Sequence, residues 1–332
     1  MRYLFCSFGS PGFLFPMVGL ALALRERGHA VAFAASRSAQ PFLDGAGLHR
    51  YPRGDRDGDS FDVKRWGQSL SAAIDVKHVE YAADRFHPDV LVSHQLSQSP
   101  LIVRERRGLP VAVLGLATYL WPAPGGDSPA DPPHVQHRRR ESFTDQVRLL
   151  NELRALFRLP RLEATPADFP MLGDLFMLRT VPALDPELPG LPAQVHPVGA
   201  CLWEPPLERA RAWDELRGHF AEPEAPLVYV QQGRTFHGFG FWPQLVEALA
   251  DRPLQVVASV GRMDDEVGAL PRNVVARPHV SQALVLPRAA AAVSGGYTSV
   301  VLAALRHGVP HVLTPVSGEG ATITHRVGDT GC

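Results

Sequence analysis

Short apolar segments alternate with amphipathic segments along most of the chain, and this alternation constrains the fold more than any other feature. The apolar segments end at glycine or polar residues, as buried strands do, while the amphipathic segments repeat their apolar residues with helical spacing. Strands that alternate with helices form right-handed β-α-β units and a parallel sheet. The sequence therefore predicts an α/β protein built from doubly wound, Rossmann-like sheets.

The alternation runs through two stretches of the chain. In the first stretch the predicted strands are Arg2–Phe8, Val31–Ala34, Val90–Ser93 and Val111–Leu116, and the predicted helices are Pro16–Arg27, Ser71–Phe86, Pro100–Arg107 and Gln136–Phe157. In the second stretch the predicted strands are 227–231, 255–259, 273–276, 290–294 and 311–314, and the predicted helices are 241–250, 282–288 and 299–306. Residues 182–206 are rich in proline and lack periodicity, which predicts a linker between the two stretches.

The length and the composition are those of an ordinary globular protein with two domains. At 332 residues the chain exceeds what one hydrophobic core usually supports, so we expect domains at residues 1–205, linker included, and 206–332. The formal net charge of -1 gives no electrostatic attraction to nucleic acid or to an anionic membrane, so neither is an expected partner. No apolar run approaches the roughly 18 residues of a membrane helix.

Cys6, Cys201 and Cys332 are odd in number and far apart, which favours a reducing, cytoplasmic setting over a disulfide framework. No recognisable cluster of metal ligands surrounds them, and no metal site is predicted. The sequence leaves open whether the chain forms a homodimer.

Several motifs resemble the donor-binding signature of family-one glycosyltransferases, above all the bacterial enzymes that decorate natural products. These motifs are Val280-Ser281-Gln282, Leu286-Pro287, the segment Ala-Val-Ser-Gly-Gly at 292–296 and Gly308-Val309-Pro310. Residues 25–31, 88–92 and 198–206 are similar to further segments of that family. The resemblance is collinear over most of the chain.

The resemblance implies the GT-B fold, in which two doubly wound, Rossmann-like domains face a cleft. The first domain would bind the acceptor, and the second, C-terminally short compared with that family, would bind the donor. The implied reaction moves a sugar, or a deoxysugar, from a TDP or UDP donor to a small natural-product acceptor and inverts the anomeric centre. The nucleoside diphosphate sugar is a co-substrate, and no other cofactor is expected.

Donor binding is expected where strands of the second domain end, because open α/β sheets bind ligands at their carboxyl edge and a helix N-terminus attracts phosphate. The candidates are Gly233, Arg234, Thr235, Val280, Gln282, Ser294, Gly295, Gly296, Tyr297, Thr298 and Glu319. Arg234 would hydrogen bond to phosphate oxygens in place of the histidine that the family carries at the position of Ser294 or Gly295. Alternatively, the Gly295-Gly296 turn binds no ligand and is shaped by backbone geometry, and Glu319 is a solvated loop acid.

The candidate acceptor site departs from the family. Phe13 stands where the resemblance implies a catalytic histidine, and phenylalanine cannot accept a proton. His94 is the candidate catalytic base, because its ordinary pKa of about 6.5 suits that role, although it could also be an interior side chain. The residues expected to contact the acceptor are Ser10, Gly12, Phe13, Tyr119 and Trp121.

These departures support a second hypothesis from a different class of function. The chain would then be a catalytically silent relative that binds a nucleotide or a metabolite, or that assists an active glycosyltransferase. Nucleotide binding with turnover would favour the enzyme, and nucleotide binding without turnover would favour the silent relative.

Overall fold

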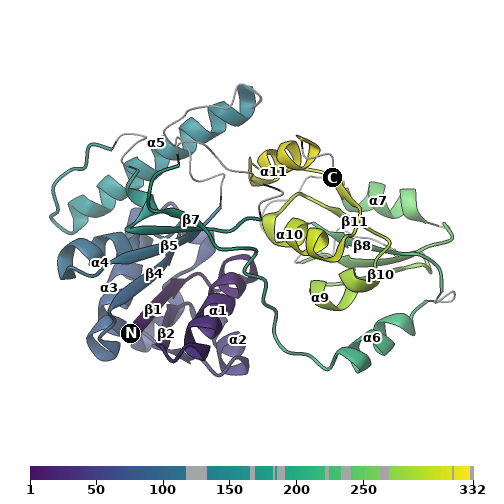
Figure 1. Cartoon of the computed structure of the whole chain (residues 1–332), viewed down its shortest axis with the longest axis horizontal. Coiled ribbons are helices and arrows are strands. Elements are labelled where there is room, and N and C mark those ends of the chain that lie inside the picture. The colour runs from purple at the N-terminus through teal and green to yellow at the C-terminus, as the bar shows by residue number, and fades with distance from the viewer. Residues whose placement is uncertain are drawn as a thin grey trace. The chain divides into compact units, whose positions relative to one another are not determined.

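The computed structural model describes residues 1–116, 133–164, 169–181, 184, 191–220, 224–232, 241–250, 252–261, 269–315 and 318–329. The chain divides into two compact units, Met1–Pro205 (unit 1) and Pro206–Cys332 (unit 2), each with its own parallel sheet between helices (Figure 1). Within these described ranges, no helix is long and apolar enough to cross a membrane.

The described part of unit 1 contains a seven-stranded parallel sheet in the order β3-β2-β1-β4-β5-β6-β7. The strands are β1 (Arg2–Ser7), β2 (Ala30–Ala35), β3 (His49–Arg50), β4 (Val90–His94), β5 (Val111–Gly115), β6 (Leu175–Leu178) and β7 (Val195–Pro197). The helices are α1 (Pro11–Glu26), α2 (Gln40–Gly45), α3 (Ser69–Phe86), α4 (Ser99–Arg107) and α5 (Pro133–Leu156). Because β1 and β4 are neighbours at the centre of the sheet, the residues that follow them share one edge.

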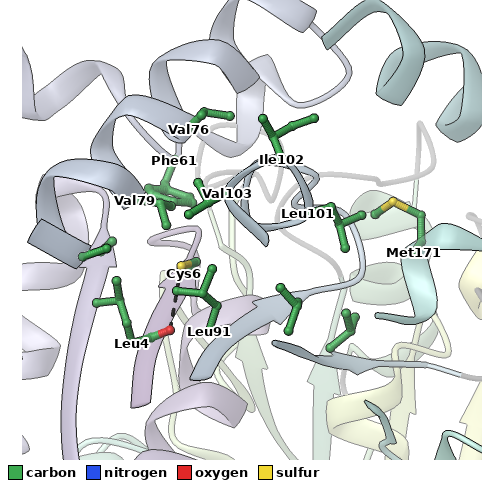
Figure 2. Close-up of a cluster of buried hydrophobic side chains, with 14 of the residues drawn as sticks. Leu4, Cys6, Phe61, Val76, Val79, Leu91, Leu101, Ile102, Val103 and Met171 are labelled. Atoms are coloured by element: carbon green, nitrogen blue, oxygen red, sulfur yellow. Dashed lines mark hydrogen bonds between the residues drawn. The ribbon is translucent and has the colours of Figure 1, made fainter. Parts of the chain in front are cut away.

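Alternate residues of β1 enter cores on opposite faces of the sheet, as the strand period of two requires. Leu4 and Cys6 belong to a buried cluster with side chains of α3 and α4, whereas Phe5 packs with side chains of α1 on the other face. Figure 2 shows the first cluster, in which Val76 and Ile102 belong to the two covering helices. A sheet covered on both faces explains why its strands are almost continuously apolar.

The described part of unit 2 contains a five-stranded parallel sheet in the order β10-β9-β8-β11-β12. The strands are β8 (Leu227–Gln231), β9 (Gln255–Ser259), β10 (Val274–Arg277), β11 (Ala291–Ser294) and β12 (His311–Leu313). The helices are α6 (Arg209–Arg217), α7 (Phe241–Leu249), α9 (Gln282–Val285), α10 (Thr298–His307) and α11 (Gly318–Asp329). Trp242 anchors α7 in a core with Val230 and Val256.

The predicted α/β fold class is confirmed, with several local corrections. Helix α1 begins at Pro11 rather than Pro16, because proline suits the first helical turn, where a missing N–H costs no hydrogen bond. The range 182–206, predicted to be a linker, contains β7, which pairs with β6. Neither of these strands was predicted, and neither was α11.

Candidate functional site

The Gly295-Gly296 turn joins the carboxyl end of β11 to the start of α10. Strand β11 lies between β8 and β12, and Ser294 is in register with Gln231 on one side and Leu313 on the other. Tyr297 is the N-cap residue of α10, and Thr298, the first residue of that helix, is buried. The candidate residues 294–298 therefore lie at the carboxyl edge of the sheet, beside a helix N-terminus.

Packing crowds both glycines of this turn, and at Gly296 the backbone itself requires glycine. A Cβ atom at Gly295 would lie 2.5 Å from Oε1 of Gln232, which is too close for real atoms. Gly296 has a φ of +74°, and a Cβ there would lie 2.9 Å from the carbonyl oxygen of Gly320 in α11. A ligand at this turn would be recognised by the polar groups around it rather than by the glycines themselves.

The buried Ser294 and the half-buried His311 form a polar pair beside the turn. Ser294 Oγ hydrogen bonds to His311 Nε2 at 2.8 Å and accepts the N–H of Gly296 at 3.2 Å. Burial lowers the pKa of His311 to about 4, so this ring is neutral near pH 7. The hydroxyl of Ser294 is thus engaged within the protein.

Gln282 reaches the same edge of the sheet through a hydrogen bond to Gln231 of β8. Its Nε2 donates to Oε1 of Gln231 at 2.7 Å, and the hydroxyl of Tyr229 donates to the same oxygen at 2.8 Å. The N–H of Val280 donates to Oγ of Ser259 at 3.3 Å. The structure therefore brings Val280, Gln282 and the residues of the turn to one edge of unit 2.

The remaining donor candidates are not all described. Gly233, Arg234 and Thr235 lie outside the described residues. Glu319 lies in α11 directly before Gly320, but its side chain is also outside what the structure describes.

In unit 1, the first turn of α1 and the end of β4 bring Phe13 and His94 together. Their ring centroids are 4.4 Å apart and the ring planes meet at 88°, in an edge-to-face contact. Ser10 is the N-cap residue of α1, and Gly12 has open space where a Cβ would lie. Tyr119 and Trp121 lie outside the described residues.

His94 is a neutral, buried imidazole. Burial and then the charge of Arg179 lower its pKa to about 3, so the expected pKa near 6.5 is wrong for the folded protein. The N–H of Leu96 donates to Nδ1 of His94 at 3.3 Å. With Nδ1 acting as an acceptor, the hydrogen of the neutral ring is on Nε2.

Several polar side chains near His94 were missed by the sequence analysis. Gln95 and Gln98, which follow β4, and Gln146 of α5 are all buried. Nε2 of Gln98 donates to the backbone oxygen of Gln146 at 2.8 Å. The side-chain oxygens of all three glutamines are buried and have no hydrogen-bond partner in the described part of the chain. The signal in the sequence was a run of polar residues directly after an apolar strand.

No site for a metal ion is found among the described residues, in which no group of three or more His, Cys, Asp or Glu side chains could hold one.

Comparison with known proteins connects this fold to sugar transfer. The 4'-demethylrebeccamycin synthase of Lentzea aerocolonigenes is 26% identical over 99% of this chain and 86% of its own length. The O-mycaminosyltylonolide 6-deoxyallosyltransferase of Streptomyces fradiae is 28% identical over 96% of this chain and 81% of its own length. No protein-family model matches the chain.

Solved structures agree with these relatives. The glycosyltransferase of kitacinnamycin matches 98% of this chain and 84% of its own with a TM-score of 0.71 and 20% identity. A spinosyn rhamnosyltransferase solved with thymidine diphosphate matches 100% of this chain and 85% of its own with a TM-score of 0.66 and 21% identity.

The two parallel sheets and these structural neighbours define a protein of the GT-B fold. The sequence relatives, which match nearly the whole chain, support an enzyme, a family-one-like glycosyltransferase of the bacterial natural-product type.

Proposed function

We propose that the chain transfers a sugar from a nucleoside diphosphate donor bound by unit 2 to a small natural-product acceptor bound by unit 1. The observation that carries this proposal is the match along 96–99% of the chain to two enzymes of this type. The name of one relative, a 6-deoxyallosyltransferase, supports a deoxysugar, and the rhamnosyltransferase solved with thymidine diphosphate supports TDP over UDP.

The proposed donor site is the carboxyl edge of the sheet in unit 2. The turn at Gly295-Gly296 and the start of α10 would face the diphosphate, because a helix N-terminus carries partial positive charge. Val280 and Gln282 would contact the nucleoside, Arg234 with Gly233 and Thr235 the phosphates, and Glu319 the sugar. The diphosphate leaves as the acceptor oxygen attacks the anomeric carbon from the opposite side, which inverts that centre.

The proposed acceptor site lies around His94 and Phe13, with Gly12 in the first turn of α1 and Ser10 at its N-cap. Tyr119 and Trp121 would add aromatic contacts to the acceptor. His94 is the proposed catalytic residue. Since Nε2 carries the hydrogen, the ring takes a proton only at Nδ1, after the hydrogen bond from Leu96 is released. Its low pKa makes it a weak base, so the acceptor proton would leave late, as the bond to the sugar forms.

We also propose a cytoplasmic setting, which the free thiols of Cys6 and Cys201 support.

The test is calorimetric titration of the full chain with TDP and UDP, followed by assays of donor hydrolysis and of transfer to a panel of hydroxylated acceptors. Tight diphosphate binding with turnover supports the proposal. Tight binding without turnover of any donor would favour the silent relative, and absence of binding would contradict donor recognition by unit 2.

A further inference from the structure

A buried carboxamide in unit 2 lacks the hydrogen bonds that its burial requires. Gln232 directly follows β8 and is 1% exposed. Neither its Nε2 nor its Oε1 has a hydrogen-bond partner within the described ranges. A buried polar group without a partner usually costs about 1–3 kcal/mol, so Gln232 needs an explanation.

The carboxamide of Gln232 lies against the turn that precedes α10. Its Oε1 is 2.5 Å from the place where a Cβ of Gly295 would lie, so the amide fills the space that a side chain at position 295 would need. Oγ1 of Thr324 in α11 lies 3.1 Å from the Cβ position of Gly296 and is also buried without a partner among the described residues. Two unsatisfied polar groups therefore border the same turn.

We propose that the Gln232 carboxamide is part of the donor site and donates its Nε2–H to a phosphate oxygen of the nucleoside diphosphate. This inference rests on the proposed function, which assigns the donor to unit 2. The N-terminus of α10 and the amide N–H would face the same anion, and a charge-assisted hydrogen bond would satisfy the buried donor. A half-turn of the amide exchanges its oxygen and nitrogen, so either group can face the turn.

A contact made by an amide differs from one made by a histidine or a carboxylate in that it does not depend on pH. Glutamine does not titrate, so its hydrogen bond to phosphate stays available at any pH at which the protein is folded. Ser294, the nearest hydroxyl on β11, is already engaged by His311 and by the N–H of Gly296. Gln232 therefore offers an uncommitted N–H donor beside Gly295, as the Thr324 hydroxyl offers an O–H donor beside Gly296.

The experiment compares the affinity for a nucleoside diphosphate with the affinity for its nucleoside, using whichever of TDP and UDP the unmodified chain binds more tightly. Gln232→Leu removes the donor and is expected to weaken diphosphate binding by about 10- to 100-fold, the range for a hydrogen bond to a charged group. Affinity for the nucleoside should not change. Gln232→Glu keeps the shape but adds a negative charge, so it should lose at least as much diphosphate affinity.

Gln255→Leu is the matched control. Gln255 is buried to a similar extent at the amino end of β9, at the opposite edge of the same sheet, and its Nε2 donates to the backbone oxygen of Ala225 at 3.0 Å. This variant should lose stability but keep its affinity for the diphosphate. Thermal unfolding of each variant separates a loss of folding from a loss of binding.

The outcomes separate this inference from the proposed function. If the unmodified chain binds no nucleoside diphosphate, both are overturned. If it binds and Gln232→Leu binds equally well, or if nucleoside and diphosphate lose affinity equally, only the role of Gln232 is overturned. Should Gln232→Leu fail to fold, Gln232→Glu decides, because undiminished diphosphate affinity with an added carboxylate would exclude contact with phosphate.

Discussion

His94 and Phe13 meet at the edge of the unit 1 sheet where the acceptor is proposed to bind. Because the pKa of His94 is lowered to about 3, the imidazole remains neutral from pH 5 to pH 8, and turnover should not fall in that range through its protonation. Changing His94 to Gln should lower turnover by about a hundredfold if the ring takes the acceptor proton. Donor affinity should hardly change.

The matched control for this experiment is His196→Gln, since His196 is an exposed histidine of the same unit. That variant should keep its full rate. The opposite result would be a turnover rate of the unmodified enzyme that falls as the pH drops, with a midpoint near pH 6.5 that disappears in the His94 variant. It would show that the ring titrates normally and would contradict the buried geometry.

Asp75 makes the stability of unit 1 depend on pH. It is buried in α3, accepts the N–H of Phe61 at 2.6 Å, and burial raises its pKa to about 7. Between pH 4 and pH 7 the folded chain keeps a proton that the unfolded chain has released, so stability falls as pH rises through this window. Asp75→Asn should therefore gain stability relative to the unmodified protein by up to about 4 kcal/mol between pH 4 and pH 8.

Denaturant unfolding at pH 4, 6 and 8 measures this difference. The amide oxygen of asparagine can still accept the N–H of Phe61, whose φ of 52° is unusual for a residue other than glycine. If Asp75→Asn and the unmodified protein differed in stability by the same amount at all three pH values, the Asp75 carboxyl would be ionised in the folded protein.

The sequence identified residues at strand ends far better than it identified buried polar residues. His94, Ser294 and Gly295 could be located because each follows or ends an apolar segment. Gln232 and Arg179 could not, because a polar side chain in a sequence indicates exposure unless tertiary packing buries it. The low pKa of His94 was missed for the same reason, since its main cause is burial.

Among the elements, the turn before α10 has the strictest steric requirement. Gly296→Ala would place a side chain at a φ of +74° and against the carbonyl of Gly320, so the variant should lose about 2–4 kcal/mol of stability. Gly28→Ala is the control, because Gly28 has a φ of +81° but nothing within 4 Å of its Cβ position. It should lose only about 1 kcal/mol, the cost of the left-handed backbone.

Urea unfolding of the two variants measures both losses of stability. Equal losses would mean that α11 moves aside at little cost, and the close approach of Gly320 would then not explain the glycine at position 296.

Whole elements were missed where local signals opposed the structure. Helix α11 contains Gly318, Gly320 and Gly328, which in a sequence indicate turns. Strand β7 is three residues long, ends at Pro197 and lies at the edge of its sheet, where proline needs no ladder partner. The central strands β8 and β9 match their predicted bounds, because continuous apolar runs with sharp ends are the clearest signals.

At the scale of the whole molecule, the chain consists of two units that each enclose a hydrophobic core. Domains with separate cores can unfold in separate transitions, so we expect calorimetry to resolve two. Core truncations assign the two transitions to the units. Leu91→Ala in β4 should lower the midpoint temperature of one, and Leu227→Ala in β8 that of the other. Each variant should lose about 2–5 kcal/mol of unfolding free energy in its own unit.

Added nucleoside diphosphate should then raise the midpoint temperature of only one transition, the one whose midpoint Leu227→Ala lowers. Ligand that binds the folded form alone stabilises it by about 2.7 kcal/mol at a concentration 100 times its dissociation constant. Because the diphosphate is proposed to contact residues of unit 2, the unit 1 transition should stay in place. A shift of the Leu91-sensitive transition alone would assign the nucleotide to unit 1, whereas equal shifts of both would mean that the units unfold as one cooperative body.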